Sequence, residues 1–255
     1  MNYGELNQWF LREQQWALLL ILAAPLAGAL FSYCTISLGP RRQMLAGWIA
    51  VCAAFVSFAV SVCFWLFLDW SAEGGAANSG VFLFPWIAAG GLHLDAALKL
   101  DSLSLTMILT VTGVGTLIHL YAIGYMAHDH SKPRFFSYFN LFLFFMLLLV
   151  LADNLGLMFV GWEGVGLCSY LLIGFWHQQM PNARAGQKAF VVNRIGDAGF
   201  LLGMFLLAAE VGSLDFDAVQ DQIAYLNPWA IEAACMLLLL GAVGKSAQIP
   251  LYLAE

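Results

Sequence analysis

Two long apolar runs separated by a short polar corner decide the fold class of this chain. They fill residues 135–175, which read FFSYFNLFLFFMLLLVLADNLGLMFVGWEGVGLCSYLLIGF. About 20 apolar residues are enough for an α-helix to cross a hydrocarbon layer about 30 Å thick. The runs Phe135–Ala152 and Leu155–Phe175 therefore predict two membrane-spanning helices, and Asp153 and Asn154 between them predict a tight turn. We expect these helices to be antiparallel and to pack against each other.

Five further apolar runs extend this pattern over most of the chain. Of the 255 residues, 62% are hydrophobic and 10% are charged, whereas soluble domains have about 45–50% apolar residues. Since backbone polar groups find no water in lipid, each span has to satisfy its own hydrogen bonds, as an α-helix does. The sequence therefore predicts an all-α membrane protein with about seven transmembrane helices. The five further candidate spans are Trp16–Ser37, Met44–Leu68, Leu103–Ile123, Ala189–Ala208 and Ala230–Leu253.

The basic residues predict the orientation of the chain in the lipid bilayer. Lys and Arg in short loops stay on the cytoplasmic side, because translocation disfavours them. One set of loops contains Arg41, Arg42, Lys132, Arg134, Arg184 and Lys188. The other set, which includes the amino terminus, contains Arg12 and Lys99 and is rich in Asp and Glu. We expect the amino terminus outside and the carboxyl terminus in the cytoplasm, in the inner membrane of a bacterium, and no binding of nucleic acid.

The segment between the second and third spans, residues 69–99, fits two structures equally well. After a stretch rich in Gly and Ala it reads VFLFPW at 81–86 and LHLD at 92–95. A short external hairpin is one structure, and an unstructured connector with an interfacial aromatic anchor is the other.

The cysteines and histidines do not form a metal-binding pattern. All five cysteines lie within apolar runs, and none has the C-x-x-C spacing of a metal or redox site. The nearest approach to a ligand cluster is His128-Asp129-His130, which we expect to be a solvated loop. We therefore expect no metal site.

Three ionisable residues lie well inside the predicted spans and indicate a polar pathway. They are Glu163, Asp197 and Lys245, and Arg194 lies one helical turn before Asp197. An Asp, Lys or Arg at the centre of a membrane helix costs about 2.5–3.5 kcal/mol on insertion, so pairing or hydration has to offset that cost. Arg194 and Asp197 share one helical face. They can form a structural pair or control the other two residues.

Glu163 and Lys245 are the candidates for a pair that changes protonation. At about 1.5 Å per residue, Glu163 lies about 12 Å into the membrane from Leu155, near the midplane. Burial disfavours the charged form of each group, and an opposite charge nearby favours it. A pair that opens and closes can therefore switch protonation, whereas a static ion pair cannot. Lys245 precedes Pro250, which predicts a broken seventh helix, and broken helices are tolerated where they line a cavity.

Four motifs resemble those of a known family. They are LDSLSLTM at 100–107, GWEGVGLCSYLLIGF at 161–175, KAFVVNRIGD at 188–197 and GAVGKSAQ at 241–248. The chain resembles the L subunits of bacterial proton-pumping NADH:quinone oxidoreductase, the equivalent of subunit 5 of mitochondrial complex I, over roughly residues 81–253.

The resemblance implies an antiporter-like membrane subunit that moves protons while quinone is reduced elsewhere in the complex. Glu163 would be the fifth-helix glutamate, Lys245 its seventh-helix partner, and Asp197 with Arg194 a modulating pair. The chain would be part of an enzyme without performing redox chemistry itself, and no flavin, iron–sulfur cluster or quinone is expected on it. Its partners would be the other membrane subunits of complex I.

The chain departs from the family pattern after Pro250. The family continues into an eighth helix and a second, inverted repeat, whereas this sequence ends at Glu255. We expect residues 1–99 to form two transmembrane helices with an external loop or hairpin, and residues 100–255 to begin the antiporter-like proton-translocation domain. The fold would then be incomplete, and a second chain could supply the missing carboxyl-terminal half.

Two other functions fit the same residues. One is a subunit of a multi-subunit cation/proton antiporter or of an ion- or bicarbonate-accumulation complex. The other is a truncated membrane scaffold, in which the intramembrane charges are static pairs. The run GVGLCSY at 164–170 favours complex I.

Overall fold

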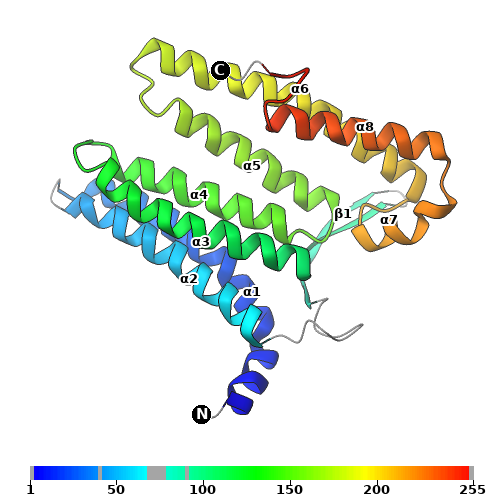
Figure 1. The fold of residues 1–255 in the computed structure, drawn as a ribbon, viewed down its shortest axis with the longest axis horizontal. Coiled ribbons are helices and arrows are strands. Elements are labelled where there is room, and N and C mark those ends of the chain that lie inside the picture. The colour runs from blue at the N-terminus through cyan, green and yellow to red at the C-terminus, as the bar shows by residue number, and fades with distance from the viewer. Residues whose placement is uncertain (1–2, 40–41, 68–78, 90–91, 253–255) are drawn as a thin grey trace. The chain divides into compact units, whose positions relative to one another are not determined.

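The computed structural model describes residues 3–39, 42–67, 79–89 and 92–252. Seven of the helices in this part of the chain are long and apolar enough to cross a membrane, which confirms the predicted number of spans (Figure 1). They are α1 (Tyr3–Cys34), α2 (Leu45–Phe67), α3 (Ser102–Tyr125), α4 (Lys132–Leu151), α5 (Leu155–Ile173), α6 (Met180–Val211) and α8 (Pro228–Lys245). The shorter elements are η1 (Thr35–Ser37), η2 (Arg42–Met44), β1 (Ser79–Ala89), β2 (Leu92–Leu100), α7 (Phe216–Gln222) and η4 (Ile223–Tyr225).

Several helix ends differ from the predicted span ends. α1 and α6 begin well before the predicted Trp16 and Ala189, because polar residues continue both helices beyond their apolar runs. The seventh span was predicted to reach Leu253, and this was wrong: α8 ends at Lys245. A proline ring clashes with the carbonyl four residues earlier. For Pro250 that residue is Ser246, which is the first residue after the helix.

The chain forms two compact units. The first comprises residues 1–81 and 98–151, and the second comprises residues 82–97 and 152–255. Helices α4 and α5 belong to different units, so the predicted packing of one against the other stays a prediction. The proposed division of the chain at residue 99 rests on the family resemblance and also stays a prediction.

Small residues allow the helices of the first unit to approach each other. The buried face of α2 is formed mainly by small side chains at helical spacing, Ala46, Gly47, Ala50, Ala54, Ser57 and Ser61. Ser57 Oγ donates to the carbonyl of Ile21 on α1 over 2.8 Å. In lipid, where apolar burial gives helices little reason to associate, such close packing and interhelical hydrogen bonds hold them together.

In the second unit, α6 and α8 lie side by side in direct backbone contact (Figure 1). A Cβ atom on Gly196 of α6 would lie 3.0 Å from the Cα of Gly244 on α8. A Cβ atom on Gly203 would likewise lie 3.0 Å from the carbonyl oxygen of Ala234. These positions therefore have no room for a side chain, and the contact extends along both helices.

The strands β1 and β2 pair as a two-stranded sheet, so the hairpin is confirmed and the unstructured connector is wrong for the described residues. Residues 69–78, 90 and 91 of the predicted segment lie outside the described part of the chain. The corner before α5 is tied to β2, because Asn154 Nδ2 donates to the carbonyl of Asp95 over 2.7 Å. The same corner is tied to the turn after α6, where the N–H of Leu155 donates to the carbonyl of Leu214. The depth at which α5 starts is thereby set by two neighbouring segments.

Candidate functional site

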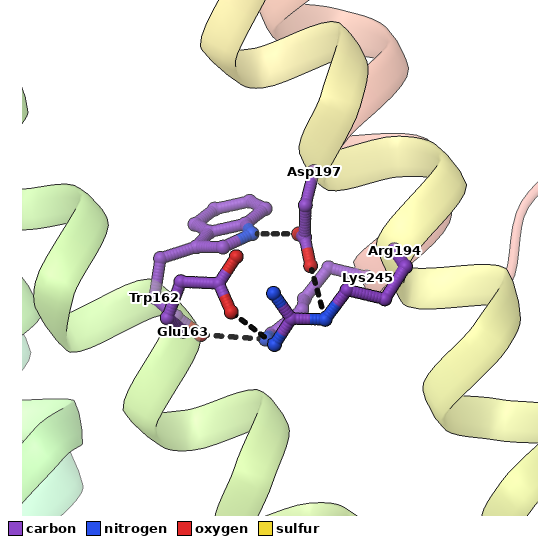
Figure 2. Close-up of polar contacts among 5 residues, drawn as sticks. All are labelled: Trp162, Glu163, Arg194, Asp197 and Lys245. Atoms are coloured by element: carbon purple, nitrogen blue, oxygen red, sulfur yellow. Dashed lines mark hydrogen bonds and ion pairs between the residues drawn. The ribbon is translucent and has the colours of Figure 1, made fainter.

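The four predicted site residues lie in one polar cluster of the second unit, together with Trp162 (Figure 2). Helix α5 supplies Trp162 and Glu163, α6 supplies Arg194 and Asp197, and α8 supplies Lys245. The glycine contact between α6 and α8 lies immediately beside these charges, because Gly196 separates Arg194 from Asp197 and Gly244 precedes Lys245.

Arg194 bridges the two carboxylates of the cluster. Its Nη2 forms an ion pair with Glu163 Oε2, and its Nε lies 3.9 Å from Asp197 Oδ2. Its guanidinium also lies over the ring of Phe190, 4.6 Å from the ring centroid. The Arg194 side chain is 44% exposed, whereas that of Asp197 is 6% exposed. Arg194 is thus at the open side of the cluster, and Asp197 is at its closed side.

Trp162 holds Asp197 from α5. The indole Nε1 donates to Asp197 Oδ1 over 2.6 Å. A hydrogen bond to an ionised carboxylate is about twice as strong as one between neutral groups. Asp197 therefore has a hydrogen-bond donor at one oxygen and a cation facing the other.

Lys245 is the last residue of α8, and its ammonium group reaches back to α5. Lys245 Nζ donates to the backbone carbonyl of Trp162 over 2.7 Å and lies 5.4 Å from the centroid of the indole ring. Gly166 leaves the space for it, because a Cβ atom there would lie 2.9 Å from Nζ. The ammonium group of Lys245, at the broken end of α8, thus lies against the middle of α5.

The observed pairing agrees with the predicted one in part. The sequence predicted a pair of Glu163 with Lys245 and a local pair of Arg194 with Asp197, and the second pair is confirmed. In the described part of the chain no ion pair joins Glu163 to Lys245, and Arg194 is the cation that contacts Glu163. The reason is geometric: Arg194 is long enough to reach both carboxylates, and the Trp162 carbonyl holds Lys245.

Sequence reasoning missed Trp162 as a member of the cluster. Its neighbour Glu163 was singled out by its charge, whereas a tryptophan in an apolar run does not stand out. The available signal was the indole N–H, which needs a hydrogen-bond partner when it is buried. Gly166 lies within the motif at 161–175, and its contact with Lys245 depends on how α5 meets α8.

With all four charged groups ionised, the cluster has two negative and two positive charges. This balance offsets the cost of placing the charges inside apolar helices. The groups form one connected chain, from Glu163 through Arg194 and Asp197 to Trp162 and Lys245. Such a chain can redistribute charge within the membrane by exchanging partners. Within the described ranges, no group of three or more His, Cys, Asp or Glu residues is placed to hold a metal ion.

Two family models match separate parts of the chain. The model described as "NADH:quinone oxidoreductase/Mrp antiporter, TM" matches residues 152–253. The model described as "NADH-Ubiquinone oxidoreductase (complex I), chain 5 N-terminus" matches residues 86–136. Residues 152–253 are thus similar to the membrane domains of the NADH:quinone oxidoreductase/Mrp antiporter family.

Several curated proteins are similar to this chain. NADH-quinone oxidoreductase subunit L of Mycobacterium tuberculosis (strain CDC 1551 / Oshkosh) is 46% identical over 233 residues, which are 91% of this chain and 36% of the relative. Subunit L of Escherichia coli (strain K12) is 47% identical over 77% of this chain and 32% of the relative. NADH-ubiquinone oxidoreductase chain 5 of Allomyces macrogynus is 49% identical over 68% of this chain and 27% of the relative. The chain thus spans about a third of the length of these relatives.

Two solved structures have a similar fold. A chain of the Mrp complex from Dietzia sp. DQ12-45-1b aligns with a TM-score of 0.77 at 23% identity, over 92% of this chain and 24% of that chain. A chain of an archaeal membrane-bound sulfane sulfur reductase aligns with a TM-score of 0.74 at 19% identity, over 90% of this chain and 44% of that chain. These similarities confirm the antiporter-like fold predicted from the sequence.

Proposed function

We propose that this chain acts as a membrane subunit of NADH:quinone oxidoreductase and takes part in redox-driven proton translocation. The observation that carries the proposal is the connected polar cluster, in which charged side chains from three membrane helices meet around Glu163. Charged residues inside membrane helices are costly, and they commonly mark ion and proton pathways. The relatives named as oxidoreductase subunits support the assignment to that complex.

In this function Glu163 exchanges its cation between Arg194 and Lys245. With Arg194 as its partner, Glu163 is held charged while Lys245 is bound elsewhere. When Lys245 takes the place of Arg194, the positive charge nearest to Glu163 comes from α8 instead of α6. Charge changes in a neighbouring subunit can drive this exchange, because the charges interact strongly where no water screens them.

The proposal extends to the surroundings of the chain. Its partners are the other membrane subunits of the complex, and a further chain or segment supplies the part that the relatives have beyond the matched third. It carries no flavin, iron–sulfur cluster or quinone itself. It lies in the inner membrane of a bacterium, with the amino terminus outside and the carboxyl terminus in the cytoplasm, as its basic loops indicate.

The test measures protons moved per NADH oxidised in membrane vesicles that contain the assembled complex. We expect Glu163→Gln and Lys245→Ala each to lower this ratio, because each substitution removes a group that can give or accept a proton. Glu232→Gln is the control, because Glu232 is an exposed carboxylate on the same helix as Lys245.

The outcomes separate the possible functions. If both variants leave the ratio and any sodium/proton exchange in the vesicles unchanged, only the scaffold function is left. An unchanged ratio together with loss of sodium/proton exchange in the same vesicles supports the antiporter alternative, which the similarity of fold to a chain of the Mrp complex favours.

A further inference from the structure

Trp162 contacts both of the helices that pack beside α5 in the polar cluster. Its indole N–H reaches α6 at Asp197, and its backbone carbonyl reaches α8 at Lys245. No other residue drawn in Figure 2 contacts both Asp197 and Lys245. This position suggests that the tryptophan determines which charges pair.

The indole ring is fixed by packing, so that its N–H has a set direction. The ring centroids of Trp162 and Phe200 are 5.0 Å apart, and Phe159 stacks on the same phenylalanine at 5.5 Å. Trp162 also packs against the apolar core that contains Leu155 and Met204. A ring held on this side cannot swing its N–H away from Asp197 without leaving the core.

The hydrogen bond from Trp162 also explains why Arg194 can form an ion pair with Glu163. Asp197 receives a hydrogen bond of 2.6 Å at Oδ1, while Arg194 Nε lies 3.9 Å from Oδ2, beyond hydrogen-bonding distance. Since the indole satisfies Asp197, Arg194 is not drawn fully onto it. The far end of the guanidinium is then free to contact Glu163.

We propose that Trp162 is a positioning residue that sets the resting pairing of the cluster. Its N–H holds Asp197 and its carbonyl holds Lys245, which leaves Arg194 as the cation of Glu163. Lys245 has to leave the Trp162 carbonyl before it can reach Glu163. This inference rests on the proposed function of the cluster in proton translocation.

The first experiment removes only the N–H of the indole. Trp162→Phe keeps a ring and the backbone carbonyl, and we expect it to lower the protons moved per NADH oxidised by about tenfold, the size of effect expected when a charged group loses a hydrogen bond. In an Asp197→Ala background the same substitution should have no further effect, because the carboxylate on which it acts is gone. If Trp162 had only a structural role, the double variant would have a lower ratio than Asp197→Ala alone. The matched control is Trp229→Phe at an exposed tryptophan on α8.

The second experiment acts on Lys245 and leaves the indole intact. Gly166→Ala places a methyl group 2.9 Å from Lys245 Nζ, which is too close, and should displace the ammonium group from the Trp162 carbonyl. We expect the ratio to fall in this variant too, and it remains informative where Trp162→Phe reduces the amount of assembled complex.

Three results overturn the inference. The indole N–H has no such role if Trp162→Phe leaves the ratio of protons to NADH as high as Trp229→Phe does. It also has none if Trp162→Phe lowers the ratio further in the Asp197→Ala background. The Trp162 carbonyl has no such role if Gly166→Ala leaves the ratio unchanged. If Glu163→Gln lowers the ratio in the same vesicles, the proposed function stands even when the inference fails. If Glu163→Gln leaves the ratio unchanged, both are wrong.

Discussion

Asn154 is the residue on which the start of α5 depends. Its side chain caps the helix, because Oδ1 accepts a hydrogen bond from the N–H of Leu157 over 2.8 Å. Its Nδ2 donates to the carbonyl of Asp95 on β2. Asn154 is 1% exposed, so water cannot replace either bond. One buried amide therefore joins the hairpin to the helix that carries Trp162 and Glu163.

We expect Asn154→Ala to lower the free energy of unfolding by about 1–2 kcal/mol. The substitution removes a helix cap and the partly buried hydrogen bond to the carbonyl of Asp95. Asn227→Ala is the control, because Asn227 caps α8 at an exposed position through one hydrogen bond to the N–H of Trp229. Thermal unfolding of the purified chain in detergent measures both. Equal losses in the two variants would mean that the contact with Asp95 contributes nothing.

Ser57 gives a second prediction at this scale, in the first unit. We expect Ser57→Ala to lower the free energy of unfolding by about 0.5–1.5 kcal/mol, because its hydroxyl bridges α2 to the carbonyl of Ile21 on α1. Ser37→Ala is the matched control, since the exposed Ser37 hydroxyl bonds locally to Cys34. Unfolding in a series of denaturing detergent mixtures gives the free energy of unfolding of both variants. If Ser57→Ala loses no more of it than Ser37→Ala does, the prediction is contradicted.

The pair α6 and α8 is the element on which the cluster is built. Its two helices meet through glycines, so the side chains that flank the contact are brought together from both helices. Arg194 and Asp197 flank Gly196 on one helix, and Lys245 follows Gly244 on the other. The spacing of glycines, rather than the charges, brings these three residues together.

We expect Gly196→Ala to weaken this element by about 1–3 kcal/mol, because the added methyl group meets backbone atoms of α8 that have to move apart. Gly124→Ala on α3 should be neutral or slightly stabilising, since a Cβ atom there meets nothing within 4 Å and alanine favours a helix. Measuring the free energies of unfolding of the two variants tests this prediction. If Gly196→Ala is as stable as Gly124→Ala, the backbone contact is looser than described.

The helices could be predicted from the sequence, and several of their ends could not. Long apolar runs imply helices because lipid offers the backbone no other partner. Helix ends depend on local chemistry that hydropathy does not register. Asp101, which belongs to a family motif, forms a capping box with Ser104 at the start of α3. The turns of α1 before Trp16 continue a helix through polar residues.

The members of the site could also be predicted, whereas their pairing could be predicted only in part. The cost of a buried charge identifies Glu163, Asp197 and Lys245 without any structure. Which cation meets which carboxylate depends on the distance between helices, and this is set by glycines on two different spans. The tryptophan was missed because its polar group is a small part of a large apolar side chain.

At the scale of the whole molecule, the basic loops predict an orientation that can be measured. We expect a cysteine at position 224, between α7 and α8, to react with a membrane-impermeant maleimide in intact cells. A cysteine at position 128, between α3 and α4, should react only after the cells are permeabilised, because it lies on the cytoplasmic side. The substitutions are Ala224→Cys and His128→Cys, in a chain whose five cysteines are replaced by serine or alanine.

The same labelling experiment can contradict the orientation. The reverse pattern would place the amino terminus in the cytoplasm. Labelling of both positions in intact cells would mean that the number of spans between them is even, in conflict with the three helices α4, α5 and α6 that separate them.

The backbone contact between Gly196 and Gly244 also has a mechanical consequence. With no side chains between them, the backbones of α6 and α8 lie in direct contact at this point, and we expect the two helices to move together. The charges they carry can change their mutual distances only by rotating side chains. Any larger displacement inside the cluster falls to α5, which carries Trp162 and Glu163 and is anchored at its first turn by Asn154. A displacement of α5 would therefore move Trp162 and Glu163 relative to Arg194, Asp197 and Lys245, which α6 and α8 carry.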